Sequence, residues 1–540
     1  MSVMVDNACG FCGEPSSQKC SGCQLVYYCC REHQKKHWSK HKSHCRPMKL
    51  CQDNVLGRYY VASRSIKAGE VVLKEVPLVQ GPSQVTGPVC LGCLKSISMH
   101  TSEECPKCGW PLCRDPQCRM SEHHVPECDW TMSKRGKKIK ISNFTAPHPS
   151  YECITTLRCL YKKFHQPAVW EKLMQLEAHL DECKKSPRYE SDQKNVIQFL
   201  LNFFKLDQDF SEAEIFKICG IIQVNAHEMP LTEPGYMAIF DRTSLVEHSC
   251  FPNLYKSFTN SGQVLLRAMK PIAAGDHLSI CYTDPLWGTI NRRHHLEESK
   301  YFTCQCDRCR DPTEFNTMYD GVKCPEHQCK GYVLPHLTPS SFEETWICHD
   351  CKKTADQDNV HKILVKIGED LSTIEKQNPE ACRKFLKTYD TGRFLHPNHY
   401  YLTDVRIALA QLYGQTTRGG IQDLSDEMLT HKIALCKQIV NLARTIVPAE
   451  GRIRGIIIFE LHASVAELGR RRSSQGQIDS AQLRAFLLES KQYLDEAVWL
   501  LQYEPSNLPE GKILVQAQEN LSSLNTVLQA LHASIGDSPM

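Results

Sequence analysis

Apolar residues recur at helical spacing through the last third of the chain. The clearest stretch has four apolar positions separated by three, four and three residues, at Leu402, Val405, Leu409 and Leu412. Gly414 follows it as a stop signal. Similar stretches occupy residues 458–468, 483–501 and 514–528. The pattern predicts that residues 356–540 form a C-terminal domain of stacked antiparallel helices with a repeat-like, TPR-like organisation.

Two segments nearer the middle have the residue types and turn signals of strand pairs. Residues 58–79 contain YYVASR and EVVLKEVPLV on either side of a Lys-Ala-Gly turn, and we expect a hairpin-like pair there. Residues 263–282 repeat the design, with VLLRAM and HLSICY around Pro271 and Gly275. Residues 151–220 have a helical pattern instead. The sequence therefore predicts an α+β protein, β-rich in the middle and helical at its C-terminal end.

Charge is almost balanced along the chain. Its 64 basic and 61 acidic residues give a formal net charge of only +3, which provides no general attraction for nucleic acid. No C2H2 or basic-helix pattern is present, so a DNA-binding zinc-finger function is disfavoured. The one concentrated basic run, residues 134–140, has two interpretations: a solvated linker, or a patch for localisation or for an acidic partner.

The 30 cysteines point to metal binding rather than to disulfides. Disulfide frameworks belong mainly to short secreted domains, whereas this chain has 540 residues. Its start, MSVMVDNACGF, lacks the basic and apolar regions of a secretory signal. No stretch approaches the roughly 18 consecutive apolar residues of a membrane span. We therefore expect a reducing location, in the nucleus, the cytoplasm or both, with no membrane partner.

The first cysteine cluster offers eight metal ligands in fewer than 40 residues. Eight ligands satisfy two tetrahedral zinc ions, and a segment with so little apolar material needs such binding, which supplies on the order of 10 kcal/mol, in order to fold. The candidate ligands are Cys9, Cys12, Cys29, His33, Cys20, Cys23, His41 and Cys45.

The second cluster again offers eight ligands and ends with the same HxxxC spacing. It looks like a degenerate copy of the first, and His123 competes with His124 because the two are adjacent. Only the matching spacing favours His124. The candidate ligands are Cys90, Cys93, Cys113, Cys118, Cys105, Cys108, His124 and Cys128.

Two smaller clusters follow. Cys304, Cys306 and Cys309 need a fourth ligand, for which Cys250 is the candidate. The last cluster has the spacing of a small zinc ribbon, with a structural role, and consists of Cys324, Cys329, Cys348 and Cys351. Together the four clusters and Cys250 make 24 ligands, which is enough for six four-coordinate zinc ions.

The first cluster closely resembles a MYND finger, a protein-interaction module with two interleaved zinc ions. The resemblance rests on the ligand spacing and on Tyr28, Cys29, Gln34, His37, Trp38 and His41. It implies one site from Cys9, Cys12, Cys29 and His33 and another from Cys20, Cys23, His41 and Cys45. His33 stands where the family usually has cysteine, and imidazole is an equally good ligand. Cys30 and His37 are competing donors that this assignment leaves out.

The segment EHSCFPN, residues 247–253, is followed by Tyr282 and then by the Cys304 cluster. In this order the elements closely resemble the SET domain of lysine methyltransferases, with its NHSCxPN motif, catalytic tyrosine and CxCxxC. MYND finger, SET motifs, ribbon and helical tail together resemble the SMYD family, in a divergent arthropod-type branch like the SmydA proteins.

This resemblance divides the chain into seven expected parts. They are a MYND-type finger (1–46), the first part of the SET domain (47–89), a second zinc-binding insertion (90–130), a linker with a helical insertion (131–220), the SET catalytic core (221–300), the post-SET zinc site and ribbon (301–355), and the helical domain (356–540).

The SMYD resemblance implies a protein-lysine methyltransferase that uses S-adenosylmethionine. The catalytic residue would be Tyr282. Carried over position by position, the cofactor contacts would be Gly57, Arg58, Glu177, His179, Asn225, Glu247, His248, Tyr301 and Phe302. The implied partners are a histone or other protein substrate, and proteins, such as co-repressors with proline-rich motifs, bound by the finger.

Three departures from the family favour an alternative, a SET-shaped scaffold without catalysis. Tyr59 stands in place of the second glycine of GxG. Glu247 replaces asparagine, so a donor is lost and a negative charge gained, although that charge can also attract the cationic cofactor. Lys300 stands where relatives have a second channel-lining tyrosine, and its charge would oppose an incoming amine.

Overall fold

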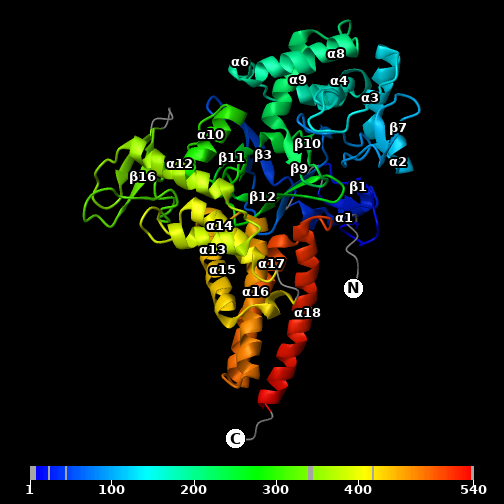
Figure 1. The fold of residues 1–540 in the computed structure, drawn as a ribbon. Coiled ribbons are helices and arrows are strands. Elements are labelled where there is room, and N and C mark those ends of the chain that lie inside the picture. The colour runs from blue at the N-terminus through cyan, green and yellow to red at the C-terminus, as the bar shows by residue number, and fades with distance from the viewer. Residues whose placement is uncertain are drawn as a thin grey trace. The chain divides into compact units, whose positions relative to one another are not determined.

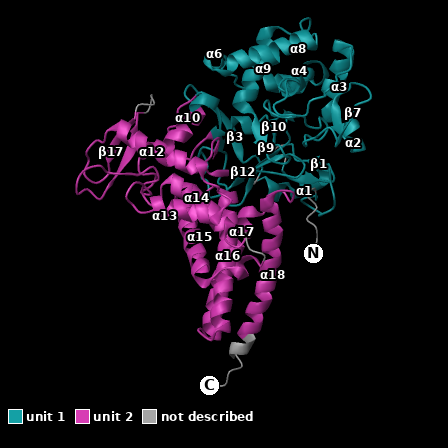
Figure 2. Cartoon of the chain, viewed as in Figure 1, with its two compact units in different colours: residues 1–247, 256–278, 297–301 teal, residues 248–255, 279–296, 302–540 magenta. Residues whose placement is uncertain are grey.

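The structure of the protein is a computed structural model, and it describes residues 8–21, 23, 25–42, 45–338, 344–415 and 419–536. The first seven residues, on which the expectation about a secretory start partly rests, lie outside this range. The chain divides into two compact units (Figure 2). Unit 1 takes residues 1–247, 256–278 and 297–301, and unit 2 takes residues 248–255, 279–296 and 302–540.

Helices and several small sheets make up the fold, and this confirms the predicted α+β class (Figure 1). The described sheets have two or three strands each. Some of them pair strands that are neighbours in the sequence, and others pair strands that are far apart in it. Helices dominate the part of the chain after residue 356.

Unit 1 begins with the first cysteine cluster. Its strands β1 (Gln18–Lys19) and β2 (Tyr27–Tyr28) pair antiparallel, and helix α1 (Arg31–His41) follows. His41 is the only buried residue of α1, and the buried cluster of this module consists of three cysteines and Tyr28. The described residues of the module therefore form no apolar core of ordinary size.

The strand pairs of unit 1 differ from the predicted ones. Strand β4 (Gly57–Ala62) pairs antiparallel with the preceding β3 (Met48–Asp53), not with β5 (Val71–Glu75). Strand β5 pairs with β13 (Val264–Ala268). The expected hairpin over residues 58–79 is therefore wrong. A residue pattern marks a strand but does not identify the strand that pairs with it, and β5 pairs with a strand far along the chain.

A second sheet of unit 1 has the order β6–β10–β9, with β10 in the centre. Its strands are β6 (Val79–Pro82), β10 (Tyr236–Ile239) and β9 (His227–Met229). The second cysteine module comes between β6 and the helical insertion. Its elements are β7 (Ser102–Glu104), β8 (Pro111–Cys113), α2 (Pro116–Arg119), the 3-10 turn η1 (Glu122–His124), α3 (Val125–Trp130) and the π turn η2 (Thr131–Arg135).

Helices fill residues 151–220, as the pattern indicated. They bury one apolar core in which Leu157, Leu160, Ile215 and Ile218 are fully inaccessible. The elements are η3 (Pro149–Tyr151), α4 (Ile154–His165), α5 (Pro167–Met174), α6 (Leu180–Lys185), α7 (Arg188–Ser191), η4 (Asp192–Ile197), α8 (Gln198–Phe203) and α9 (Glu212–Asn225). Ser211 and Glu214 form a capping box at the start of α9.

The basic run at residues 134–140 is partly docked onto this insertion. Lys134 forms an ion pair with Asp209 at 2.7 Å, and the guanidinium of Arg135 lies 4.2 Å from the ring centre of Phe203. Arg135 also donates to the carbonyl of Lys138 at 2.8 Å. Neither original interpretation, free linker or open patch, describes these two residues.

The SET-like part of the chain also contains several short elements. Some of them have residues in both units. The elements are η5 (Thr243–Leu245), β11 (Glu247–His248), β12 (Leu254–Phe258), β14 (Ser279–Ile280), α10 (Thr289–Lys300) and α11 (Asp307–Arg310).

Unit 2 contains the ribbon and the C-terminal helices. The ribbon is an antiparallel sheet of β15 (Val322–Lys323), β16 (Tyr332–Leu337) and β17 (Glu344–Cys348). The helical elements are α12 (Gln357–Thr373), α13 (Pro379–Tyr389), α14 (Tyr400–Leu412), η6 (Gly420–Asp423), α15 (Asp426–Ile446), α16 (Gly451–Ser474), α17 (Ser480–Leu501) and α18 (Pro509–Gly536).

The buried faces of these helices are the ones that the periodicity indicated. Leu402, Val405 and Leu409 are fully buried on α14, which ends at Leu412, two residues before Gly414 with its positive φ. Helix α16 instead continues through Gly469. The glycine there lets α17 approach closely, because a side chain would meet Cβ of Phe486 at 2.7 Å. The TPR-like organisation stays a prediction.

Among the described helices, none combines the length and the apolar composition that crossing a membrane requires.

Gly109 in the second cysteine module makes a test of local packing possible. Gly109 and Gly136 both have positive φ, at 82° and 75°. A Cβ on Gly109 would lie 2.0 Å from the Ile139 carbonyl oxygen, whereas one on Gly136 would meet nothing within 4 Å. Gly136→Ala should cost about 1 kcal/mol for backbone strain alone. Gly109→Ala should cost at least ~2 kcal/mol more, because backbone must move.

Thermal unfolding of the full chain, followed together with zinc release, checks this pair of variants. Equal effects of the two substitutions would contradict the packing described around Gly109.

Candidate active site and metal centres

The structure gathers the predicted metal ligands into groups of four. In five of the predicted groups, the ligand atoms all lie within 4.8 Å of one another. They are Cys9, Cys12, Cys29 and His33; Cys20, Cys23, His41 and Cys45; Cys90, Cys93, Cys113 and Cys118; Cys105, Cys108, His124 and Cys128; and Cys250, Cys304, Cys306 and Cys309. In the ribbon, Cys324 lies 3.8 Å from Cys351 and Cys329 lies 3.7 Å from Cys348, measured between sulfurs.

These distances fit zinc. Four sulfurs about 2.3 Å from a common tetrahedral centre lie about 3.8 Å apart. The sulfurs of Cys12 and Cys29 are 3.7 Å apart, and those of Cys20 and Cys45 and of Cys93 and Cys113 are 3.8 Å apart. A disulfide would need about 2.05 Å. The clusters therefore have the donor set and the size of four-coordinate zinc sites, and the predicted zinc cofactor is confirmed.

The structure distinguishes the two histidines that the sequence left open. His124 turns Nε2 toward the Cys108 sulfur at 3.4 Å, while His123 turns its Nε2 to the side-chain amide of Gln80 at 2.8 Å. The other nitrogen of His124, Nδ1, lies 3.3 Å from Glu127 Oε1. A carboxylate that accepts from the second ring nitrogen is the usual support for a zinc-binding histidine.

Glu127 is itself held by Arg158. The guanidinium of Arg158 donates to Glu127 Oε1 at 2.7 Å and to the carbonyl of Leu91, beside Cys90, also at 2.7 Å. Burial alone would raise the pKa of Glu127, but Arg158 and His124 outweigh it and hold the pKa below its ordinary value. One buried ion pair thus supports both metal sites of the second module.

The Cys250 centre of unit 2 lies in a buried charge network. Cys250 is 3.5 Å from Cys309 and 3.9 Å from Cys304 between sulfurs. Arg292 donates to the Cys309 sulfur at 3.7 Å. Four thiolates on one zinc ion carry two negative charges in excess, which nearby cations offset.

Glu314 joins the two arginines of this network. It accepts from Arg292 at 3.2 Å and pairs with Arg308, which also donates to the backbone carbonyl of Cys250 at 3.4 Å. All three side chains are fully buried. Burial raises the pKa of Glu314, but the two guanidiniums prevail and lower it to about 2.

The predicted catalytic tyrosine is tied to this centre within unit 2. The backbone N–H of Tyr282 donates to His248 Nδ1 at 3.0 Å, so the proton of that imidazole sits on Nε2. Nε2 lies 3.2 Å from the Cys250 sulfur. The rings of Tyr282 and Phe302 lie 5.3 and 5.8 Å from that of His248. His248 therefore links Tyr282 to the metal centre.

Most of the predicted cofactor contacts gather in unit 1. The amide of Asn225, at the end of α9, donates to the carbonyls of Glu177 at 2.7 Å and Ile221 at 2.9 Å. Both bonds use the amide nitrogen, so the amide oxygen Oδ1 is the polar atom that remains for a ligand. Arg58 donates to the carbonyl of Gln175, next to Glu177. The loop before α6 thus lies between the start of β4 and the end of α9.

His179 and Tyr301 belong to the same group, both with positive φ, at 45° and 60°. Their ring centres are 5.8 Å apart, and Gln223 donates to the Tyr301 hydroxyl at 2.5 Å. Glu177 accepts from the backbone N–H groups of Ala178 and His179 at 3.1 and 3.3 Å. Glu177 is thereby turned back onto its own loop.

Lys300 binds the end of a helix. Its Nζ donates to the carbonyls of Val224 at 2.7 Å and Gln223 at 3.5 Å, in the last turn of α9, where the helix dipole favours a cation. Burial, and to a smaller extent Lys256, lowers the pKa of Lys300 to about 8. The ammonium thus has carbonyl partners in unit 1.

The two remaining departures from the family pattern lie close together. The ring of Tyr59 stacks on that of His277, with centres 4.6 Å apart and an angle of 11°. Nδ1 of His277 lies 3.1 and 3.0 Å from the two carboxylate oxygens of Glu247. Gly57, at φ 69°, has open space where a Cβ would point. Sequence reasoning missed His277, because only strand pairing brings it to Tyr59.

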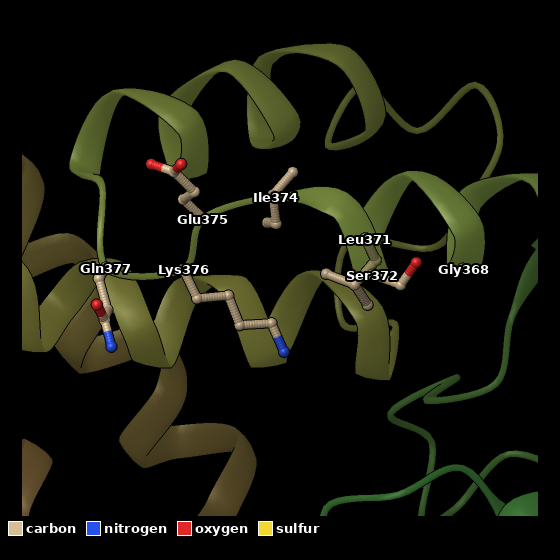
Figure 3. A pocket seen from close by; sticks show the side chains of 7 residues that line it. All are labelled: Gly368, Leu371, Ser372, Ile374, Glu375, Lys376 and Gln377. Carbon is tan, nitrogen blue, oxygen red and sulfur yellow. The ribbon is translucent and has the colours of Figure 1, made fainter.

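A shallow pocket of about 550 Å³ lies elsewhere in unit 2, at the end of α12 and before α13 (Figure 3). Its lining carries Glu375 and Lys376 as the only charged side chains. None of its residues belongs to the predicted cofactor or catalytic set.

Family models match two parts of this chain. A MYND finger model matches residues 9–45 and a SET domain model matches residues 57–283, which includes Tyr282. The metal groups and the Tyr282 environment thus belong to a SET- and MYND-domain protein, and a SET domain implies S-adenosylmethionine as its cofactor.

Several known proteins are similar to this chain. SmydA-8 isoform A of Drosophila melanogaster is 29% identical over 313 residues, covering 56% of this chain and 64% of the relative. Histone-lysine N-methyltransferase ASHR1 of Arabidopsis thaliana is 23% identical over 426 residues, 74% of this chain and 83% of the relative. N-lysine methyltransferase SMYD2 of Mus musculus is 27% identical over 213 residues, 38% of this chain and 47% of the relative.

The chain is similar to proteins of the SMYD family in its MYND finger and its SET domain. The similarity to SmydA-8 agrees with the expected arthropod-type branch. The chain spans just under two-thirds of the length of both SmydA-8 isoforms, 64% and 66%.

Zinc content separates the two histidines of the second module. His124→Ala should lower the zinc content of the purified chain from six ions to five, because one tetrahedral site loses a ligand. His123→Ala, the matched control next to it, should retain six. Native or elemental mass spectrometry measures both. A loss of zinc from the His123 variant, with none from the His124 variant, would reverse the assignment.

Proposed function

We propose that this chain is a protein-lysine N-methyltransferase that uses S-adenosylmethionine and acts on histone or other proteins, in transcriptional regulation. The observation that supports it most is the connection from Tyr282 through His248 to the Cys250 centre. The backbone of this tyrosine is thus held by a residue of the buried metal site, and its side chain packs against that site. The names of ASHR1 and SMYD2, both methyltransferases, support the same function.

When bound, S-adenosylmethionine supplies a methyl group on a sulfonium sulfur. The protein must present an uncharged lysine amine, although the ordinary pKa of lysine is near ~10.4. Removal of water lowers that pKa by disfavouring the ammonium. Lys300 shows that burial has this effect in this fold, because its own pKa falls to about 8. Tyr282 would orient the amine, since its backbone is held by His248.

The three residues that depart from the family pattern each have partners in the structure, and this reduces the support for a scaffold without catalysis. The Tyr59 ring packs on His277, the Lys300 ammonium binds the end of α9, and Glu247 has a histidine partner. Each therefore has a defined place within unit 1.

The finger supports a second role, in binding partner proteins. Phe11 and Trp38 are 48% and 45% exposed, so both aromatic side chains offer surface to a partner. We propose that these rings receive a proline-rich segment of a partner, in the nucleus or the cytoplasm. Loss of peptide binding in a Trp38→Ala variant that keeps its zinc would support this role, and unchanged binding would reject it.

Replacement of Tyr282 tests the catalytic proposal. Tyr282→Phe should lower the rate of methyl transfer to a protein extract at least ~100-fold, because the orienting hydroxyl is lost. Affinity for S-adenosylmethionine should stay within about threefold, since the ring and the backbone contact to His248 remain. Radiolabel transfer and calorimetry measure the two quantities.

Tyr493→Phe on α17 is the matched control, because it removes a hydroxyl that contacts only Glu489. It should leave transfer unchanged. If the wild-type chain fails to bind S-adenosylmethionine, or if Tyr282→Phe transfers methyl groups at the wild-type rate, the enzymatic proposal is wrong.

A further inference from the structure

His277 connects two residues that depart from the family pattern. Its Nδ1 lies 3.0 Å from a carboxylate oxygen of Glu247, and its ring stacks on Tyr59. Tyr59 directly follows Gly57 and Arg58, two predicted cofactor contacts, and Glu247 is a third. All of these residues belong to unit 1. The His277 imidazole therefore contacts both Tyr59 and Glu247, close to the predicted cofactor contacts of this unit.

Backbone pairing fixes the position of the imidazole. Val61 of β4 forms an antiparallel bridge with His277, and the N–H of Leu278 donates to the carbonyl of Tyr60 at 2.9 Å. Side chains two positions apart share a face of a strand, so Tyr59 is the diagonal neighbour of His277 on that face. The nearly parallel rings follow from this register. His277 is thus held from one side by a strand and from the other by a carboxylate.

Glu247 has the chemistry to receive a cation. S-adenosylmethionine carries an ammonium at its amino-acid end and a positively charged sulfonium. An asparagine at position 247 could offer these positive groups only a neutral amide oxygen, whereas glutamate offers a negative charge. The side chain of Glu247 is 20% exposed and that of His277 46% exposed, so the pair is accessible to a ligand from solvent. A neutral imidazole that donates Nδ1–H orients the carboxylate and leaves its charge available.

We propose that His277 is a positioning residue for the cofactor: it holds the Glu247 carboxylate toward the ammonium of S-adenosylmethionine, and Tyr59 holds His277. This inference rests on the proposed function and extends it to residues outside the family motifs. It also makes cofactor affinity depend on pH. Protonated His277 forms an ion pair with Glu247, which cancels the negative charge that the ammonium would meet.

Other ionisable groups lie near His277. On β3 and β4 these are Asp53, Cys51 and Arg58, and Asp276 precedes His277 in the chain. The N–H groups of Leu56 and Val55 hold the pKa of Asp53 below its ordinary value, so Asp53 stays ionised between pH 7.0 and 5.5. The α-ammonium of the ligand also stays charged there. The comparison of the two pH values therefore tests the Glu247–His277 pair.

Three substitutions separate the parts of this role. His277→Asn keeps an N–H donor near the position of Nδ1 but does not titrate, so it should bind S-adenosylmethionine within about threefold of wild type. His277→Phe keeps the stacking on Tyr59 but loses the donor, and Glu247→Gln loses the charge. His277→Phe and Glu247→Gln should each weaken the binding of S-adenosylmethionine about 3- to 10-fold at pH 7.0. The effect is modest because the Glu247–His277 pair is partly exposed.

Calorimetry at pH 7.0 and 5.5 gives the second readout. Wild-type affinity for S-adenosylmethionine should fall about 3- to 10-fold on acidification, and that fall should be absent in His277→Asn and Glu247→Gln. 5′-Methylthioadenosine, which keeps the adenine and ribose but lacks the ammonium, should bind equally to all variants. Equal weakening of both ligands in Glu247→Gln would place the carboxylate at the ribose and overturn the assignment.

His165 provides the matched control. Its ring stacks on Tyr161 with centres 3.7 Å apart, and it lies 3.9 Å from the Asp129 carboxylate, with 43% of its side chain exposed. His165→Asn should change neither affinity nor its pH dependence. Wild-type binding at pH 7.0 with no effect of the His277 variants would reject this inference alone. No wild-type binding at either pH would reject the proposed function itself.

Discussion

Tetrahedral coordination by cysteine and histidine is the constraint on which the small modules of this chain depend. Among its described residues, the first finger buries three cysteines and a tyrosine but no aliphatic cluster, and helix α1 buries only His41. Such a module cannot offset the conformational entropy of folding by burial of apolar surface. The C-terminal helices are different, because Leu461, Val465 and Leu494 are almost completely buried there. Metal binding and apolar packing thus stabilise different parts of one protein.

The Cys250 centre has a further consequence, because it carries the SET motif. A metal site with four thiolates has excess negative charge, and Arg292 and Arg308, joined by Glu314, surround it with buried positive charge. Removal of any member would leave an uncompensated buried charge. His248 donates to the Cys250 sulfur and accepts from the Tyr282 backbone, so the position of the tyrosine follows from the metal geometry. In unit 2, two hydrogen bonds thus connect the metal ligand Cys250 to the proposed catalytic residue Tyr282.

Sequence alone could predict the ligand groups, because ligand spacing in a short segment leaves few tetrahedral combinations. It left His123 and His124 open, since only the orientation of a ring toward Cys108 separates them. Helical faces such as that of α14 followed from periodicity, which is a local property. The partner of β4 did not, because residue pattern marks a strand but not the strand that pairs with it, and the bridge from β4 to His277 joins residues far apart in the chain. The Glu247–His277 pair was missed for the same reason.

The central claim is that six four-coordinate zinc ions organise this protein, and X-ray absorption at the zinc edge of the full chain tests it most directly. The six groups contain 21 cysteines and three histidines, so the average zinc ion should have 3.5 sulfur and 0.5 nitrogen neighbours. Zinc–sulfur distances should be about 2.3 Å. With six ions measured per chain, this result would support the account. Fewer ions, or an average near two sulfurs with oxygen or nitrogen in their place, would contradict it.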